Sequence, residues 1–344
     1  MIDSYPLLRP WLFSLDPEEA HRITFTNLDR AQRCGLLRCF IKQPASDPRE
    51  LCGMTFPNPI GLAAGLDKDG QHIDALASLG FGFLEIGTVT PKPQAGNPKP
   101  RMFRLPEAQG IINRMGFNND GVDECVKRVR QSQFWQDGGI VGLNIGKNAT
   151  TPIEEAASDY VTAMEAVYET ASYITINISS PNTQNLRALQ GEEMLRSLLA
   201  SVDIARKSLS DRYGVRKPLF LKIAPDLDAK DIGFIADLLL EFSIDAIIAT
   251  NTTIAREAVQ DLPFGNEAGG LSGAPVRAAS THIIELLKAR LNDHIPIIGV
   301  GGIMSGQDAQ EKIAAGASLV QLYSGLIYRG PTLISECAAQ LKSA

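Results

Sequence analysis

The chain has 344 residues, of which 44% are hydrophobic and 21% are charged, and its formal net charge is −6. These values are ordinary for a globular protein, and the acidic balance argues against a general nucleic-acid binder. The five cysteines form no CxxC pair and have no histidine at ligand spacing, so neither a disulfide framework nor a metal site is expected.

Residues 1–43 do not share the pattern of the rest of the chain. The segment Asp16-Pro17-Glu18-Glu19 is typical of a capped helix start. Before it, four apolar residues share one face of a predicted helix: Leu8, Trp11, Leu12 and Leu15. Two short amphipathic helices can lie on a membrane surface or pack on the protein body, and the pattern alone favours packing. No apolar run is long enough to span a bilayer, and no signal peptide is evident.

From about residue 60 one theme recurs, in which a short β-branched apolar run is followed by a polar loop and then by a helical pattern. There are eight such runs: Pro59–Ala63, Phe83–Gly87, Ile140–Ile145, Tyr173–Ile178, Leu219–Ile223, Ala246–Ala249, Ile295–Val300 and Leu319–Leu322. Near-continuous apolar strands that alternate with helices indicate a parallel sheet covered by helices. Eight units favour an α/β fold of the (β/α)8 TIM-barrel type, with residues 1–43 as a small helical extension and residues 44–344 as the barrel.

Three helices carry start signals of their own. Thr151-Pro152-Ile153-Glu154 predicts a capping box, and the stretches from Asp226 to Phe242 and from Ser305 to Ala315 have helical spacing. Residues 90–120 form a long insertion after the second strand, rich in proline and glycine. We expect this insertion to be a loop without regular structure that acts as a lid.

Polar residues and glycines gather after the predicted strands, where a barrel places its active site. The run YITINISSPNT, residues 173–183, ends in Asn177, Ser180 and Asn182. Glycines concentrate after the last three strands, as in GGLSG and GVGGI. Glycine lets backbone N–H groups approach phosphate oxygens closely, so a ligand with a phosphate group is expected.

Lys222 interrupts an apolar strand, and a buried lysine needs a compensating interaction. Three interpretations stay open from the residues alone. The lysine can form an ion pair with a nearby carboxylate, form a Schiff base as in an aldolase, or place a cation beside a flavin ring.

Asparagines from several strand-end loops point to a small polar substrate. Asn113, Asn177, Asn182 and Asn251 each offer amide donors and an acceptor. A ring of amides suits a molecule with alternating N–H and C=O groups, such as a dihydropyrimidine. A single asparagine is more often a turn residue, but four at one mouth are harder to explain in that way.

Together these motifs resemble a known family. GLAAGLDKDG, NRMGFNN, NISSPNT, LKIAPDL, ATNTT, GGLSG, GVGGI and QLYSGLIYRGP, in this order, are similar to dihydroorotate dehydrogenase, the flavin enzyme of pyrimidine biosynthesis. Ser180 stands where the soluble branch of the family carries cysteine and the membrane-associated, quinone-reducing branch carries serine. The N-terminal helical segment is also a mark of the quinone branch. The resemblance therefore favours a membrane-facing role for residues 1–43 over simple packing.

The resemblance implies one FMN per chain, bound by residues from most strand ends. The implied cofactor-binding residues are Ala64, Gly65, Leu66, Asp67, Lys68, Thr88, Asn144, Asn177, Lys222, Thr250, Gly273, Gly302, Tyr323 and Ser324. The implied dihydroorotate-binding residues are Lys68, Asn113, Arg114, Met115, Gly116, Phe117, Asn177, Asn182, Asn251 and Thr252.

The resemblance also implies the chemistry. Ser180 would take the proton from C5 of dihydroorotate, with Thr183 in a water relay and Phe117 as a shield, while the C6 hydride passes to FMN N5. Electrons would then pass to ubiquinone or menaquinone at a site that includes His21 and Arg104. The expected protein is a monomer, bound peripherally to the cytoplasmic side of a bacterial inner membrane.

Three alternatives differ from this hypothesis. A second FMN barrel enzyme would use fumarate or a nicotinamide nucleotide as acceptor, and Ser180 with residues 1–43 argues against it. An aldolase would form a Schiff base at Lys222. A peripheral membrane scaffold would have no flavin, so flavin co-purification separates it from the flavin enzymes.

Overall fold

The computed structural model describes residues 5–342; residues 1–4 and 343–344, at the outer ends of the two predicted segments, lie outside the described residues. Eight parallel strands form a closed barrel in the order β10-β12-β13-β3-β4-β7-β8-β9. All eight predicted strands are present: β3 (Ile60–Leu62), β4 (Phe83–Val89), β7 (Val141–Ile145), β8 (Tyr173–Asn177), β9 (Leu219–Ile223), β10 (Ala246–Ala249), β12 (Ile297–Val300) and β13 (Leu319–Leu322). The prediction of a (β/α)8 barrel is therefore confirmed.

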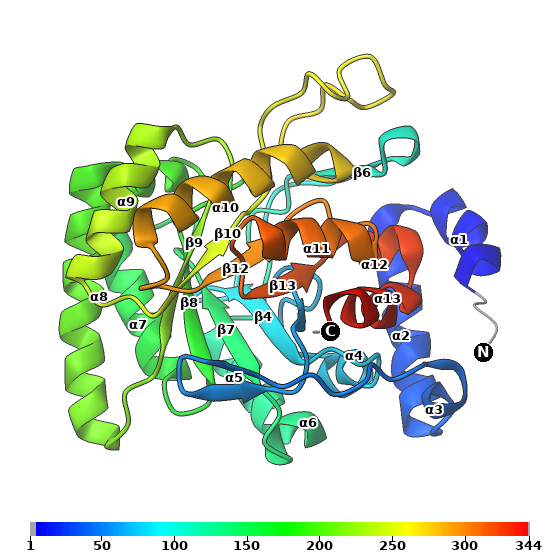
Figure 1. Ribbon diagram of the computed structural model, residues 1–344, viewed down its shortest axis with the longest axis horizontal. Helices are drawn as coiled ribbons and strands as arrows, with labels where there is room; N and C mark the ends of the chain where they lie inside the picture. Colours follow the sequence, from blue (N-terminus) through cyan, green and yellow to red (C-terminus); the bar gives the residue numbers. More distant parts are fainter. Residues whose placement is uncertain (1–4, 343–344) are drawn as a thin grey trace.

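Helices surround the barrel on its outer side (Figure 1). They are α4 (Ile73–Ala77), α5 (Val122–Gln131), α6 (Gln133–Gln136), α7 (Ala156–Val167), α8 (Glu192–Tyr213), α9 (Ala229–Glu241), α10 (Arg277–Leu291), α11 (Gly306–Ala314), α12 (Ser324–Arg329) and α13 (Thr332–Leu341). Short 3-10 turns precede or interrupt these units: η1 (Pro106–Ala108), η2 (Ile153–Glu155), η3 (Leu186–Gln190) and η4 (Ala274–Val276). The apolar core lies between the helices and the outer face of the strands.

Two helix starts differ from the sequence prediction. The capping box at Thr151 is wrong, because a 3-10 hydrogen bond from the Glu155 N–H to the Pro152 carbonyl (3.1 Å) delays the first residue of α7 to Ala156. The helix expected from Asp226 begins at Ala229, because Asp228 caps it in a reciprocal capping box with Asp231. Ser305 caps α11 as predicted, through the Asp308 N–H.

The insertion after β4 contains an antiparallel hairpin, so the expectation of a loop without regular structure is wrong. Strands β5 (Met102–Leu105) and β6 (Gly110–Asn113) pair with each other, and β6 pairs with β11 (Gly270–Gly273) from the far end of the chain. A small apolar cluster that includes Phe103 and Leu271 holds this sheet together. The pairing fixes the insertion at the rim of the barrel, beside the carboxyl ends of the strands.

A hairpin and an aromatic layer close the opposite end of the barrel. Strands β1 (Arg49–Leu51) and β2 (Met54–Phe56) form the hairpin, and the Phe56 ring meets the Phe83 ring edge-on at 5.0 Å. Tyr173 and Phe220 stack at 4.3 Å inside the barrel. Because these aromatic rings fill the end of the barrel where the strands begin, the polar side chains farther along the same strands lie toward the carboxyl ends of the strands.

Helices α1 (Tyr5–Ser14), α2 (Pro17–Arg33) and α3 (Leu37–Phe40) lie at one side of the barrel near α12 and α13 (Figure 1). The predicted cap is present, since the Asp16 side chain accepts hydrogen bonds from the Glu18 and Glu19 N–H groups. Helix α1 contains no buried residue, and Leu8 and Trp11 are 53% and 54% exposed. The apolar face of α1 is therefore only partly covered by the barrel.

Candidate active site

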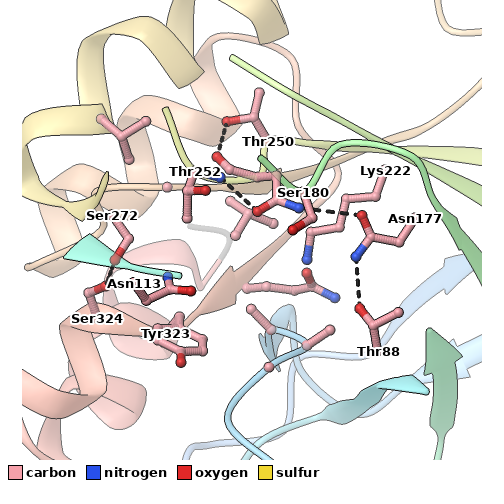
Figure 2. Close-up of a pocket in the computed structure, with 18 of the residues that line it drawn as sticks. Thr88, Asn113, Asn177, Ser180, Lys222, Thr250, Thr252, Ser272, Tyr323 and Ser324 are labelled. Atoms are coloured by element: carbon pink, nitrogen blue, oxygen red, sulfur yellow. Dashed lines mark hydrogen bonds between the residues drawn. The ribbon is translucent and has the colours of Figure 1, made fainter. Parts of the chain in front are cut away.

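One cleft at the carboxyl ends of the strands collects most of the candidate residues. Its volume is about 970 Å³ with the solvent at its mouth included. In Figure 2, Thr88, Asn177 and Lys222 lie on one side of the cleft, with Ser272, Tyr323 and Ser324 on the other. The candidate residues that line it are Ala64, Gly65, Lys68, Thr88, Asn113, Met115, Gly116, Phe117, Asn177, Ser180, Asn182, Lys222, Thr250, Asn251, Thr252, Gly273, Gly302, Tyr323 and Ser324.

Six candidates lie elsewhere. Leu66 is in the core, and Asp67 is buried while its carboxylate accepts from the Gln71 and His72 N–H groups. Asn144 lies below the lining of the cleft, fully buried. Arg114 pairs with Glu267 at 2.6 Å, on the side of the antiparallel sheet. His21 and Arg104 join the N-terminal helices to the barrel and do not line the cleft.

Lys222 forms the ion pair that its buried position suggested. It extends from β9, and its Nζ lies 3.7 Å from the Glu85 Oε1 of β4, with both side chains almost fully buried. Burial lowers the pKa of Lys222, and the Glu85 carboxylate acts in the opposite direction. The pair holds an ammonium group at the floor of the cleft.

A chain of amides and hydroxyls runs from this ion pair to the cleft. Asn144 Nδ2 donates to Glu85 at 2.8 Å, and Asn144 Oδ1 accepts from Thr88 Oγ1 at 2.6 Å. Asn177 Nδ2 donates to Thr88 Oγ1 at 2.8 Å (Figure 2). Asn251 Nδ2 donates to Asn177 Oδ1 at 3.4 Å. The chain fixes which face each amide presents to a ligand.

Ser180 lies on the turn after β8 and is 6% exposed. Its Oγ accepts a hydrogen bond from the Asn182 N–H at 3.2 Å. The Asn182 side chain donates to Asn113 Oδ1 at 3.1 Å, which joins this turn to the end of β6. The Oγ1 of Thr183 is buried, and no protein group in the described part of the chain bonds to it. Ser180 therefore lines the cleft, while Thr183, three residues later, holds a buried hydroxyl outside the lining.

Lys68 supplies a second cation to the lining. Burial lowers its pKa to about 8, and repulsion from Arg101 acts in the same direction. Near pH 7 the ammonium form still prevails, so the cleft presents a positive charge to an anionic group.

Two glycines of the lining have conformations and surroundings that exclude a side chain. Gly273 has φ +94°, and a Cβ there would lie 2.2 Å from the Gln109 carbonyl oxygen. Gly302 has φ +77°, and a Cβ there would lie 2.4 Å from Arg277 Cβ. Glycine alone meets both conditions, so these two turns of the lining keep their backbone conformation only without a side chain.

The two quinone-site candidates, His21 and Arg104, form hydrogen bonds between the N-terminal segment and the barrel. His21 Nε2 lies 2.8 Å from the Leu66 carbonyl, which only accepts, so this nitrogen carries the proton. Burial lowers the pKa of His21 to about 4, so the ring is neutral at neutral pH. Arg104 donates to the Phe13 and Leu15 carbonyls and lies over the Phe13 ring at 4.8 Å.

Comparisons with known proteins identify the family. The family model described as dihydroorotate dehydrogenase matches residues 48–344. The chain belongs to the dihydroorotate dehydrogenase family. A relative from Polynucleobacter asymbioticus, named dihydroorotate dehydrogenase (quinone), is 75% identical over the full length of both chains. A relative of the same name from Cupriavidus pinatubonensis is 60% identical over 98% of each chain.

Solved structures agree with this assignment. The crystal structure of a dihydroorotate dehydrogenase from Eimeria tenella in complex with ferulenol has a TM-score of 0.86 and 38% identity, covering 95% of this chain and 90% of that one. The protein described here is therefore an enzyme of this family, an oxidoreductase built on a TIM barrel.

Sequence reasoning assigned no role to several residues of the site. Glu85 was missed, although a glutamate within the apolar run FLEIGTV carries the same signal as Lys222 in its own strand. Gln321 stands in a quoted motif but received no role, and it lines the cleft. The other lining residues without an assigned role are Ala63, Ser272, Val276, Val300, Gly301, Ile303, Leu322 and Gly325. Most of these residues are apolar or glycine, so their residue type gives no sign of a site. They line the cleft because of where the strand ends and the following turns place them.

Proposed function

We propose that this enzyme oxidises (S)-dihydroorotate to orotate in pyrimidine biosynthesis, with one bound FMN per chain and a membrane quinone as electron acceptor. The observation that carries the proposal is that Ser180, Lys68, Lys222 and the four asparagines face one cleft at the strand ends, which glycine turns also line. The names of the relatives support the substrate and the acceptor.

The lining fits a flavin mononucleotide. Gly273 and Gly302 line the cleft, where backbone N–H groups without a side chain would approach a phosphate, and the hydroxyls of Ser324 and Ser272 lie on the same lining. The carbonyl oxygen of Gln321 is buried and lacks a partner within the described protein, so a ligand donor can complete its bonding. FMN bound here would supply the hydride acceptor, and Lys222 would place a positive charge near its ring.

The substrate side is supported by the amides. Asn182 Oδ1 and Thr252 Oγ1 are buried, and neither bonds to a group in the described residues. These acceptors, with the amide donor of Asn113, suit the N–H and C=O groups of a dihydropyrimidine. Lys68 would pair with the substrate carboxylate.

Ser180 would take the proton from C5 of the substrate. Serine is a weak base unless its own proton moves on, and the unpaired Thr183 hydroxyl offers a second station through water. Phe117, 8% exposed, would keep bulk water from the reacting carbons. The Glu85 carboxylate favours the ammonium form of Lys222 against the effect of burial, whereas a Schiff-base aldolase needs a free amine.

The quinone would enter between the N-terminal helices and the barrel, past His21 and Arg104. None of the helices within residues 5–342 is long and apolar enough to cross a membrane. Exposed apolar residues on the first helix, on the third helix and directly before the third helix support a peripheral contact: Leu7, Leu8, Trp11, Phe40 and Leu36.

The deciding experiment is anaerobic. Dihydroorotate is expected to bleach the yellow absorbance of the purified protein, and a soluble quinone is expected to restore it. A colourless protein that does not take up added FMN would overturn the cofactor assignment. Bleaching without recovery on quinone would keep the substrate and overturn the acceptor.

The lowered pKa of Lys68 predicts an alkaline limit to activity. Above about pH 8 the ammonium loses its proton, so kcat/KM for dihydroorotate should fall about tenfold per pH unit. Lys68→Arg keeps the positive charge to higher pH and should flatten this limb, even if its rate at pH 7 is lower. A wild-type profile that stays level to pH 10 would contradict the role of Lys68.

Membrane contact through α1 is tested with vesicles. We expect Leu8→Ser/Trp11→Ser to reduce binding to anionic lipid vesicles at least about tenfold, because each exposed apolar side chain contributes about 1.5–3 kcal/mol when buried. Ile204→Ser, at an exposed apolar residue on α8, is the matched control and should bind as the wild type does. Equal binding of all three proteins would exclude α1 as the contact.

A further inference from the structure

Glu85 places its carboxylate inside the barrel, below the cleft, and the whole residue is buried. It comes from the middle of β4 and contacts groups from four other strands. Oε1 accepts from Asn144 Nδ2 at 2.8 Å and lies 3.7 Å from Lys222 Nζ. Oε2 accepts from Gln321 Nε2 at 2.8 Å and from the Tyr173 hydroxyl at 3.2 Å. Both oxygens are therefore surrounded by donors alone.

This arrangement fixes the orientation of Gln321. An ionised carboxylate can only accept, so the glutamine must turn its NH2 group to Glu85. Its carbonyl oxygen then points elsewhere, and that atom is buried without a bond to any described protein group. Because Gln321 lines the cleft, the acceptor that it presents to a ligand follows from the charge of Glu85.

Glu85 also fixes the orientation of the Asn144 amide. Asn144 must turn its NH2 group to Glu85, so its carbonyl oxygen accepts from the Thr88 hydroxyl and from Asn177 Nδ2 at 3.2 Å. The Asn177 carbonyl oxygen accepts from Asn251 Nδ2 at 3.4 Å, and also from the Ser179 N–H at 3.3 Å and the Ser179 hydroxyl at 3.1 Å. Each NH2 group points back toward Glu85, and each carbonyl points onward to the substrate side. Glu85 therefore fixes the orientation of Asn144 directly, while backbone N–H groups of Ser179 and Thr252 fix those of Asn177 and Asn251.

We propose that Glu85 is a positioning residue, which sets the donor–acceptor direction of Asn144 toward Thr88 and Asn177 and holds the Lys222 ammonium and the Gln321 amide at the floor of the cleft. The role rests on the proposed FMN site, since the groups that Glu85 orients are those proposed to face the flavin. Glu85 itself does not line the cleft and would touch neither flavin nor substrate.

The substitution Glu85→Gln tests this direction with little change in shape. A glutamine presents one NH2 group where the carboxylate presents only oxygens. If that group takes the Oε1 position, Asn144 must rotate to accept from it, and the Asn144 NH2 group then faces Asn177 Nδ2, another donor. If it takes the Oε2 position, it faces Gln321 and Tyr173. Either way mispaired donors reach the cleft, and the FMN dissociation constant of the apoprotein should rise about 10- to 100-fold.

A second substitution moves the carboxylate along the chain. In Glu85→Gln/Asn144→Asp, the introduced amide can donate to the new carboxylate from the Oε1 position and still accept from Gln321 and Tyr173. That carboxylate accepts from Thr88 and Asn177 as Asn144 did, and the charge near Lys222 is kept. The double variant should therefore bind FMN within about threefold of the wild type. Asn144→Asp alone places two carboxylates at the 2.8 Å contact and should bind FMN poorly.

Tyr173→Phe is the matched control, because it removes one hydrogen bond to Glu85 and leaves the charge, the amides and the lining unchanged. It should bind FMN within about threefold of the wild type. The measurement is titration of each apoprotein with FMN, followed by flavin fluorescence, together with thermal unfolding of the apoproteins.

The outcomes separate the two proposals. Wild-type apoprotein that binds no FMN would overturn the proposed function itself. With a wild type that binds, Glu85→Gln at wild-type affinity would overturn only the role of Glu85. A folded double variant that binds FMN no better than Glu85→Gln would also overturn it. If the carboxylate matters because it orients its hydrogen-bond partners, a carboxylate at position 144 should restore FMN binding. If Glu85→Gln does not fold, near-native FMN binding by the double variant supports the proposal, and weak binding by a folded double variant contradicts it.

Discussion

Ser180→Ala is expected to slow the bleaching of the flavin absorbance by dihydroorotate about 10²- to 10⁴-fold, the usual contribution of a general base. This factor corresponds to about 2.7–5.5 kcal/mol of activation free energy. The hydroxyl accepts one hydrogen bond, from the Asn182 N–H, so its removal leaves a single backbone donor without its partner. The FMN content and the thermal stability should therefore change little, and the loss should be in the rate of the first half-reaction.

Stopped-flow mixing under anaerobic conditions measures this rate directly. Reoxidation of the bleached variant by a soluble quinone should proceed at the wild-type rate, since the proposed base takes part only in substrate oxidation. Wild-type bleaching by Ser180→Ala would remove Ser180 from the mechanism.

Ser180→Cys gives a graded form of the same test. A thiol has a pKa of about 8.5, far below that of a serine hydroxyl, so it can act as a base without a relay once it ionises. We expect its bleaching rate to exceed that of Ser180→Ala and to rise with pH through the titration of the thiol. A rate equal to that of the alanine variant at every pH would indicate that position 180 only shapes the cleft.

The barrel was predictable because its signal is local and repeated. Each barrel strand is buried on both faces, so it corresponds to a short apolar run in the sequence. Eight such runs leave few alternative folds. The sheet formed by β5, β6 and β11 was not predictable in this way. Its third strand comes from residues 270–273, more than 150 positions away, and glycine-rich segments give little strand signal.

Site residues were predictable where a polar side chain follows a strand, as for Asn177, Ser180 and Asn251. The partners of these residues were harder to find. Glu85 and Gln321 meet across the barrel although 236 positions separate them, and only the closed sheet brings them together. Asn144 was expected to contact the cofactor directly, yet it lies below the lining and acts on Thr88 and Asn177. Sequence motifs thus indicate which residues gather at a site, while the barrel register decides which of them face the ligand.

Lys222→Met should weaken FMN binding at least about tenfold and also destabilise the apoprotein. The methionine keeps much of the volume of the side chain but leaves the Glu85 carboxylate buried without its cation. Removing one partner of a buried ion pair typically costs about 3–5 kcal/mol. Denaturant unfolding of the apoprotein measures this loss, and titration with FMN measures the change in affinity.

The double variant Lys222→Met/Glu85→Gln separates the two effects. With both charges removed, no isolated charge remains in the barrel, and the free energy of unfolding should return to within about 1.5 kcal/mol of the wild type. FMN affinity should stay low, because the ammonium beside the proposed flavin position is still absent and the amide chain has lost its carboxylate. Recovery of FMN affinity together with stability would mean that Lys222 serves only to neutralise Glu85. Stable but weakly binding protein would mean that the ion pair is kept for the ligand, since the fold does not require the charges.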